Sequence, residues 1–251
     1  LNTTGTQNTA LGMGALVFNT TASNNTAVGY NALNANTTGE QNVAIGMEAG
    51  KSQTTGYGST LVGYQAGYSQ TTGAGNDSNN TYIGRKAGYT TTTAANNTAV
   101  GYDAFGQNAL KANTTGAGNV AVGTNALDAN TTAGRNTAVG YNSLTSNTTG
   151  DNNTAVGENS GLATTTGHNN TFIGQDAGEA NTTGDYNVAL GSDALDSNTT
   201  ADNNTAIGSS ALAANTTGTR NTAVGSLAGD ALTEANDNVA IGQTALGLDT
   251  L

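Results

Sequence analysis

One 17-residue pattern runs through the whole chain. The string Asn-Thr-Ala-Val-Gly and its close variants recur fourteen times, at intervals of 17 residues except for one interval of 21 and one of 22. The leading residues are Asn8, Asn25, Asn42, Ser59, Asn80, Asn97, Asn119, Asn136, Asn153, Asn170, Asn187, Asn204, Asn221 and Asn238. We call them position 1 of coils 1 to 14. A short fixed period is typical of repeat proteins, in which each unit buries its apolar residues against its neighbours.

Two adjacent positions of the repeat hold one kind of residue in every coil. Position 4 is always Val, Ile or Leu, and position 5 is always Gly, whereas position 7 takes polar residues such as Asn, Glu, Gln, Lys and Asp. Drift in a duplicated low-complexity tract would not separate the positions in this way, so we interpret position 4 as buried and position 7 as exposed. Position 8 is Ala or Ser, and position 9 is Leu, Gly or, once, Phe105. Representative structural pairs are Val28 and Gly29, Ile45 and Gly46, Val139 and Gly140, and Ile207 and Gly208.

The repeat predicts strands and corners rather than helices. Seventeen residues are too few for two helices and a turn, and Asn, Thr and Gly are poor helix formers. A β-branched residue before Gly favours a short strand at positions 2–4, and Gly permits the positive φ of a tight corner. We expect a second strand at positions 6–9 and a turn at the Asn-Thr-Thr-Gly of positions 12–15.

The expected fold is therefore all-β, a parallel β-solenoid (β-roll) of about fourteen 17-residue coils. It forms a single tandem-repeat domain over residues 1–251, with small insertions near 76–79 and 106–110 that bulge outward. Because the chain begins in mid-pattern and shows no signal peptide, we expect a segment of a longer fibre.

Charge and composition exclude several partners. The net charge is −11, and six Lys and Arg residues cannot line nucleic acid or an anionic membrane surface. No cysteine is present, so we expect no disulfide framework and no thiolate metal site. No apolar run is long enough to insert this segment into a membrane.

The strings Asn42–Gly46 and Asn238–Gly242, both Asn-Val-Ala-Ile-Gly, resemble the head repeats of trimeric autotransporter adhesins. That resemblance implies a left-handed, trimeric parallel β-roll that projects from the bacterial surface and binds matrix or host molecules. The longer unit also resembles repeat arrays of bacterial surface proteins and phage tail-fibre-like proteins, which often precede a self-cleaving chaperone domain. The unit here is longer than that of the adhesin heads.

Catalytic chemistry finds no support in the sequence. There is no cysteine nucleophile, the serines lack a neighbouring base, and the one histidine, His168, lies in a predicted turn where we expect it to be solvated. We therefore predict that the protein is not an enzyme and has no catalytic or cofactor-binding residues.

Acidic residues recur at two repeat positions. Asp151, Asp185 and Asp202 share position 16, and Asp176 and Asp193 share position 7. Bound Ca²⁺ could relieve the repulsion between stacked carboxylates, but the glycine–aspartate nonapeptide of calcium-binding β-rolls is missing. We favour surface charge and predict no metal site.

Glycosylation motifs fall at position 12. An attached sugar could point outward at this corner, and a buried ladder of asparagine side chains is an equally favoured interpretation. The candidate residues are Asn2, Asn19, Asn36, Asn113, Asn130, Asn147, Asn181, Asn198 and Asn215.

The leading functional hypothesis is a non-catalytic fibre or filament segment, extracellular or at the cell surface. Its self-association would be end to end, because uncapped strand edges favour stacking, or as a homotrimer. The alternative is an adhesin head or phage tail-fibre shaft that binds host glycans or cell surfaces. Tyrosines at position 6 could stack on sugars, although packing is favoured, and no coil shows an unusual aromatic or charged cluster. They are Tyr30, Tyr64, Tyr102 and Tyr141.

Ice binding is a third hypothesis, because regular Thr columns on a flat β-face suit an ice surface. Against it, we expect the two threonines at positions 13 and 14 to point to opposite sides.

Overall fold

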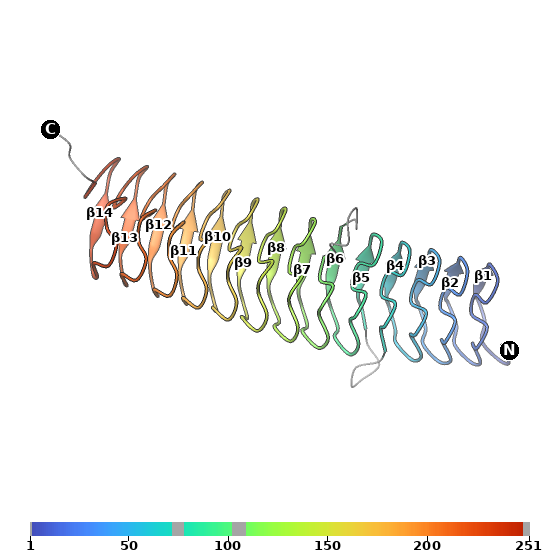
Figure 1. Cartoon of the computed structure of the whole chain (residues 1–251). Coiled ribbons are helices and arrows are strands. Elements are labelled where there is room, and N and C mark those ends of the chain that lie inside the picture. The colour runs from blue at the N-terminus through green and yellow to red at the C-terminus, as the bar shows by residue number, and fades with distance from the viewer. Residues whose placement is uncertain (1, 72–77, 102–108, 248–251) are drawn as a thin grey trace. The chain divides into compact units, whose positions relative to one another are not determined.

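The chain forms a parallel β-solenoid, as predicted. The computed structural model describes residues 2–71, 78–101 and 109–247, and in these residues the regular elements are fourteen three-residue strands, one per coil (Figure 1). The strands are β1 Thr9–Leu11, β2 Thr26–Val28, β3 Val43–Ile45, β4 Thr60–Val62, β5 Thr81–Ile83, β6 Thr98–Val100, β7 Val120–Val122, β8 Thr137–Val139, β9 Thr154–Val156, β10 Thr171–Ile173, β11 Val188–Leu190, β12 Thr205–Ile207, β13 Thr222–Val224 and β14 Val239–Ile241.

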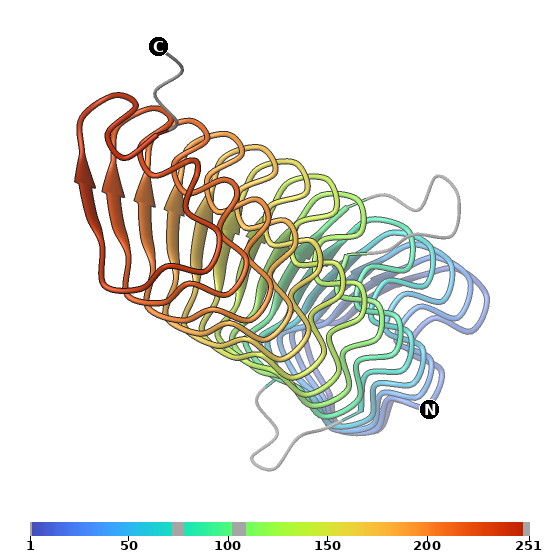
Figure 2. The same ribbon diagram turned by 60° about the vertical axis from the view of Figure 1, so that its left-hand side comes forward.

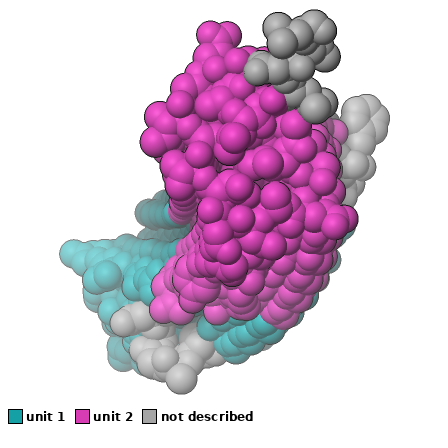
Figure 3. All heavy atoms as spheres, turned by 90° about the vertical axis from the view of Figure 1, so that its left-hand side faces the viewer, with its two compact units in different colours: residues 1–132 teal, residues 133–251 magenta. Residues whose placement is uncertain are grey.

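Two compact units divide the coils between them. Unit 1 comprises residues 1–132 and contains β1–β7, and unit 2 comprises residues 133–251 and contains β8–β14 (coloured separately in Figure 3). Within each unit every strand pairs in parallel with the next one along the chain, in register, as Ala27 does with Ala44 and Ala206 with Ala223. Equal repeat positions therefore stack into columns.

Only the middle residue of each strand points into the coil. In β2 Ala27 is fully buried, whereas Thr26 and Val28 lie on the outer face, because side chains alternate along a strand. The prediction that position 4 is buried was wrong. Ile45 and Ile207 are 41% and 36% exposed. The coil is so thin that an alanine at position 3 suffices to meet the opposite wall.

That opposite wall is a turn and not the predicted second strand. In coil 2 the Ala32 N–H donates to the carbonyl of Gly29 over 3.3 Å, and the backbones of Asn31 and Leu33 are left-handed, with φ of 53° and 47°. Left-handed residues cannot continue a strand. The turn directs Ala32 and Leu33 into the core, and Figure 2 shows strands on one wall of the coils only.

Large and small residues alternate between the two walls. Where position 3 is large instead of Ala, position 9 of the same coil is Gly instead of Leu. A Cβ on Gly88 would lie 2.5 Å from Tyr82 Cε2, and one on Gly178 would lie 2.5 Å from Phe172 Cε1. A large residue at position 3 is therefore balanced by glycine at position 9 in these three coils. The three pairs are Leu61 with Gly67, Tyr82 with Gly88, and Phe172 with Gly178.

The glycine at position 5 turns the corner after the strand, as predicted. Gly29 has a φ of 134°, and a Cβ there would lie 2.5 Å from the carbonyl oxygen of Gly46 in the next coil. Both the positive φ and the close approach of two backbones require glycine, so this position does not vary.

The two wide intervals leave the strand register intact. Thr60 pairs with Thr81 and Thr98 with Val120. The Leu110 N–H donates to the carbonyl of Ala126 in the next coil along the chain, as the N–H groups of other position-9 residues do. Leu110, and not Phe105, therefore occupies position 9 of coil 6. Ser78, Asn79, Ala109 and Leu110 thus belong to regular coil. The remainder of the two predicted insertions, residues 76–77 and 106–108, lies outside the described residues, as do Tyr102 and Phe105.

Candidate binding surfaces

Asparagine at position 1 joins each coil to the next and closes its own coil. The Asn25 Oδ1 accepts the N–H of Asn42 over 3.0 Å, and the Asn25 Nδ2 donates to the carbonyl of Gly39 over 2.8 Å. The same bonds link Asn170 to Asn187 in unit 2. These side chains are buried, and burial makes each satisfied amide important for the stack.

Asparagine at position 12 forms a second buried column. The Asn36 Nδ2 donates to Asn19 Oδ1 over 3.2 Å and to the carbonyl of Gly39 over 2.9 Å. The nitrogen that would carry a glycan is thus a donor inside the stack, so glycan attachment would require that coil to open. Of the two equally favoured interpretations, the buried asparagine ladder describes every candidate except Asn2, which is exposed. The buried candidates are Asn19, Asn36, Asn113, Asn130, Asn147, Asn181, Asn198 and Asn215.

The two threonines of the turn differ in their surroundings. The Thr37 Oγ1 donates to the carbonyl of Thr54 in the next coil over 3.1 Å, while Thr38 is exposed. Position 13 is therefore part of the stack, and only position 14 presents a threonine to solvent.

Position 16 holds a column of cross-coil acceptors. The His168 Nδ1 accepts the N–H of Asp151 over 2.9 Å, and the His168 N–H donates to Asp185 Oδ1 over 2.6 Å. Asp202 Oδ1 accepts the N–H of Asp185 in the same way, over 2.7 Å. His168 is half-buried rather than solvated. Across the described residues, no three His, Asp or Glu side chains are placed to hold a metal ion.

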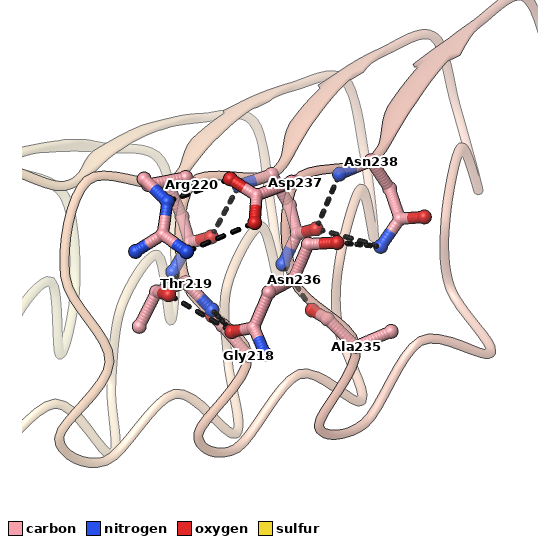
Figure 4. A network of polar contacts seen from close by, with 9 residues as sticks. Gly218, Thr219, Arg220, Ala235, Asn236, Asp237 and Asn238 are labelled. Carbon is pink, nitrogen blue, oxygen red and sulfur yellow. Dashed lines mark hydrogen bonds and ion pairs between the residues drawn. The ribbon is translucent and has the colours of Figure 1, made fainter.

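Exposed columns also make contacts between coils. At position 17 the Arg220 guanidinium forms two bonds to the carboxylate of Asp237, of 2.6 and 2.9 Å (Figure 4). This hydrogen-bonded pairing lowers the pKa of Asp237 and raises that of Arg220. Beside it, the N–H and hydroxyl of Thr219 both donate to Asn236 Oδ1, over 2.7 and 2.8 Å.

An uncharged apolar surface follows the strands of each unit. We define the outer sheet face as the side chains at repeat positions 2 and 4, which are the first and third residues of each strand from β1 to β14. Position 2 is Thr or Val and position 4 is Val, Ile or Leu in every coil. Ile83 and Leu190 are 40% and 43% exposed. Continuous apolar surface of this kind is typical of an interaction site.

Aromatic and cationic side chains gather on coils 3 to 5. Tyr68 and Tyr89 stack with their ring centroids 5.1 Å apart and their planes at 20°. The Lys51 Nζ lies 5.3 Å from the Tyr68 centroid, and the Lys86 Nζ lies 5.6 Å from the Tyr89 centroid. We define the basic–aromatic patch as Lys51, Tyr64, Tyr68, Arg85, Lys86 and Tyr89.

A carboxylate helps to hold this patch. Glu48 accepts from Lys51 Nζ over 2.6 Å and from Gln65 Nε2 over 2.7 Å, and these hydrogen bonds lower the pKa of Glu48. The Arg85 guanidinium lies 5.6 Å from the Tyr64 centroid. The expectation that no coil shows an unusual aromatic or charged cluster concerns single coils, whereas this patch is assembled from three coils that become adjacent in the stack.

Positions 7 and 10, which hold Lys86 and Lys51 in the basic–aromatic patch, carry only acids on coils 10 and 11. We define the acidic patch as Asp176 and Asp193 at position 7 with Glu179 and Asp196 at position 10. Burial, followed by repulsion from Asp176 and Asp196, raises the pKa of Glu179. Burial, followed by repulsion from Asp193 and Asp176, raises the pKa of Asp196. Glu179 and Asp196 therefore lie in environments that disfavour their charged forms.

No protein-family model matches this sequence, and neither the curated proteins nor the solved structures compared with it show a significant match. The described residues also contain no apolar helix of membrane-spanning length. The surfaces on which a function can be argued are the outer sheet face and the two charged patches.

Proposed function

We propose that this chain is a non-catalytic structural segment of an extracellular fibre, in which copies associate through the outer sheet face. The observation that carries the proposal is the exposed position 4, which is aliphatic in every coil. The resemblance of the repeats to adhesin heads supports a location outside the cell.

Strand formation alone does not explain this position. Threonine is as compatible with a strand as valine, and the neighbouring outward position 2 uses threonine in most coils. Position 4 never does. Covering an exposed isoleucine or valine gains about 25 cal/mol per Å² of apolar surface. An aliphatic residue repeated at every strand favours contact with an equally regular surface, and a second copy of this chain presents one.

The rest of the coil supports a structural role. The side-chain amides of positions 1 and 12 and the hydroxyl of position 13 bond to adjacent coils, as Asn25, Asn36 and Thr37 show. Such side chains add rigidity to the stack and leave few polar groups for chemistry. Length and stiffness are the properties that this arrangement supplies.

Analytical ultracentrifugation of a face variant tests the proposal. Ile45→Thr, Ile83→Thr, Ile173→Thr and Ile207→Thr in one chain keep the β-branched shape and remove apolar area on the outer sheet face. We expect the wild type to associate with increasing concentration even in high salt, and the variant to associate at least about tenfold more weakly, since about 1.4 kcal/mol corresponds to that factor.

The matched control changes exposed threonines at position 14, for example Thr183→Ser and Thr217→Ser, and should associate as the wild type does. Far-UV circular dichroism should show the same β content in all three proteins. A wild-type chain that stays monomeric at high concentration would contradict the proposal.

A further inference from the structure

We propose that the basic–aromatic patch of one copy binds the acidic patch of a second copy and so sets the stagger between neighbouring chains. This inference rests on the proposed self-association and adds to it a specific register. It concerns two surfaces that occupy the same repeat positions in different coils.

The outer sheet face cannot set a stagger by itself. Its columns repeat in every coil, so sliding one chain along another by one coil restores nearly the same apolar contact. Regular surfaces leave such register poorly specified, and local charge is the usual device that specifies it. The two patches are charged features that break the repetition of the coils.

Charge is divided unequally between the two units. Residues 1–132 contain five Asp and Glu against four Lys and Arg, whereas residues 133–251 contain twelve against two. No Lys or Arg occurs from residue 136 to residue 219, the stretch that contains the acidic patch. The acidic patch thus has no Lys or Arg close to it along the chain, and a second copy can supply one.

The two patches share repeat positions and carry opposite charge. Lys51 and Lys86 occupy position 10 of coil 3 and position 7 of coil 5, the acids occupy positions 7 and 10 of coils 10 and 11, and stacked strands repeat about every 4.7–4.9 Å along the coils. Lys51 and Lys86 lie two coils apart along these columns, whereas an acid stands at both positions in each of the two acidic coils. Columns of the same period therefore carry opposite charge in the two patches.

Each patch is prepared for a partner of opposite charge. The stacked Tyr68 and Tyr89 rings lie within 5.3 and 5.6 Å of the Lys51 and Lys86 ammonium groups, and contact with a ring restricts a flexible lysine before it binds. In the acidic patch, burial and then the repulsion of neighbouring carboxylates disfavour the ionised form of Asp196, and a facing cation relieves that repulsion.

A charge-swap experiment on the full chain tests the inference. One variant has Arg85→Glu with Lys86→Glu, and the other has Asp193→Lys with Asp196→Lys. Sedimentation velocity compares each variant and their equimolar mixture at about 0.05 M and about 0.5 M salt, between which screening increases severalfold. We expect each variant alone to lose the salt-sensitive part of wild-type association by about tenfold, and the mixture to regain it.

The control has Lys111→Glu with Arg135→Glu, which changes the net charge equally outside the patch, and it should keep the salt-sensitive association. The inference is overturned if the mixture stays as weak as its components, or if the control loses as much. It is also overturned if Arg85→Glu with Lys86→Glu abolishes binding of heparin, used as an anionic polysaccharide probe, while self-association is unchanged. If every variant associates equally at both salt concentrations, the stagger is refuted and the proposed function is not. If the wild type and all variants fail to associate at any salt concentration, the proposed function is refuted as well.

Discussion

At the scale of single residues, the coil combines backbone strain with core packing at position 9. Leu33 and Leu212 are fully buried with left-handed φ values of 47° and 51°. The left-handed backbone costs a non-glycine residue about 1–2 kcal/mol, and burying the leucine side chain gains about 1.5–3 kcal/mol. Where Phe172 fills the core, Gly178 replaces leucine and the strain disappears. The presence of Gly in the three coils with a large residue at position 3 follows from that balance.

Substitution of the corner glycine at position 5 should destabilise the coil, because both its backbone conformation and its contact with the next coil exclude a side chain. Gly140 has a φ of 142°, and an added Cβ would lie 2.2 Å from the carbonyl oxygen of Gly157. We expect Gly140→Ala to lower the free energy of unfolding by about 2–4 kcal/mol in urea titrations. Gly134→Ala is the control, since Ala95 and Ala117 already stand at its repeat position, and it should cost less than about 0.5 kcal/mol. Equal losses in the two variants would refute this account of the corner.

Protonation of the acidic patch should stabilise unit 2. The folded-state pKa values of Glu179 and Asp196 are raised, so the folded chain binds more protons than the unfolded chain between the raised and the ordinary values. Stability from these two groups therefore increases as pH falls through that interval. We expect Glu179→Gln with Asp196→Asn to melt above the wild type at pH 7 and to lose this advantage near about pH 4, the ordinary range of carboxyl groups. Glu234→Gln removes an exposed carboxylate of coil 13, away from the patch, and a pH trend as large in this control would count against the patch.

At the scale of the coil, the sequence predicts the path of the strand wall better than that of the turn wall. Period, parallel register, the strand at positions 2–4 and the corner at Gly29 all follow from the repeat. Burial at Val28 does not, because positions 3 and 4 are both apolar and alternation allows either to face inward. The turn at Asn31 and Leu33 was also missed, since a left-handed leucine contradicts ordinary preference and is selected only by core packing.

The charged patches could have been found from the sequence by aligning the coils. Lys51 and Tyr68 are separated by one period, and Asp176 and Asp193 by another, so a register of columns brings each pair together. The stacking of Tyr68 on Tyr89 depends on rotamers, and the buried direction of Asn36 depends on the turn geometry. Neither could be deduced before the coil was known.

Core compensation within one coil predicts strong coupling between two substitutions. Phe172→Ala should cost about 3–5 kcal/mol through the cavity it leaves, and Gly178→Leu should destabilise because its Cβ would begin 2.5 Å from the phenyl ring. Together they recreate the Ala–Leu pair of a standard coil such as Ala206 with Leu212. We expect a double-mutant cycle from urea unfolding to show a favourable coupling of about 1–3 kcal/mol. Additive losses would contradict the exchange of volume between the walls.

At the scale of the whole molecule, stability should follow the number of intact coils. Each coil contacts its neighbours in the stack, so removal of one period lets the flanking coils meet in the same register. Deleting residues 187–203 should keep the β-type circular dichroism spectrum, with a urea m-value reduced in proportion to the residues removed. Deleting 187–202 instead shifts every later position by one and should collapse the signal of unit 2. A similar loss from both deletions would refute the columnar account.

The intervals of 21 and 22 residues show what the stack does and does not fix. Thr60 still pairs with Thr81, and Thr98 with Val120, although the number of residues between them is not 17. The strand ladder fixes the position at which each coil forms its next strand, and it does not fix the number of residues between successive strands. The length of chain between two strands can therefore differ without loss of the pairing that aligns the columns, and this is how such a repeat can gain residues and still fold as one ladder.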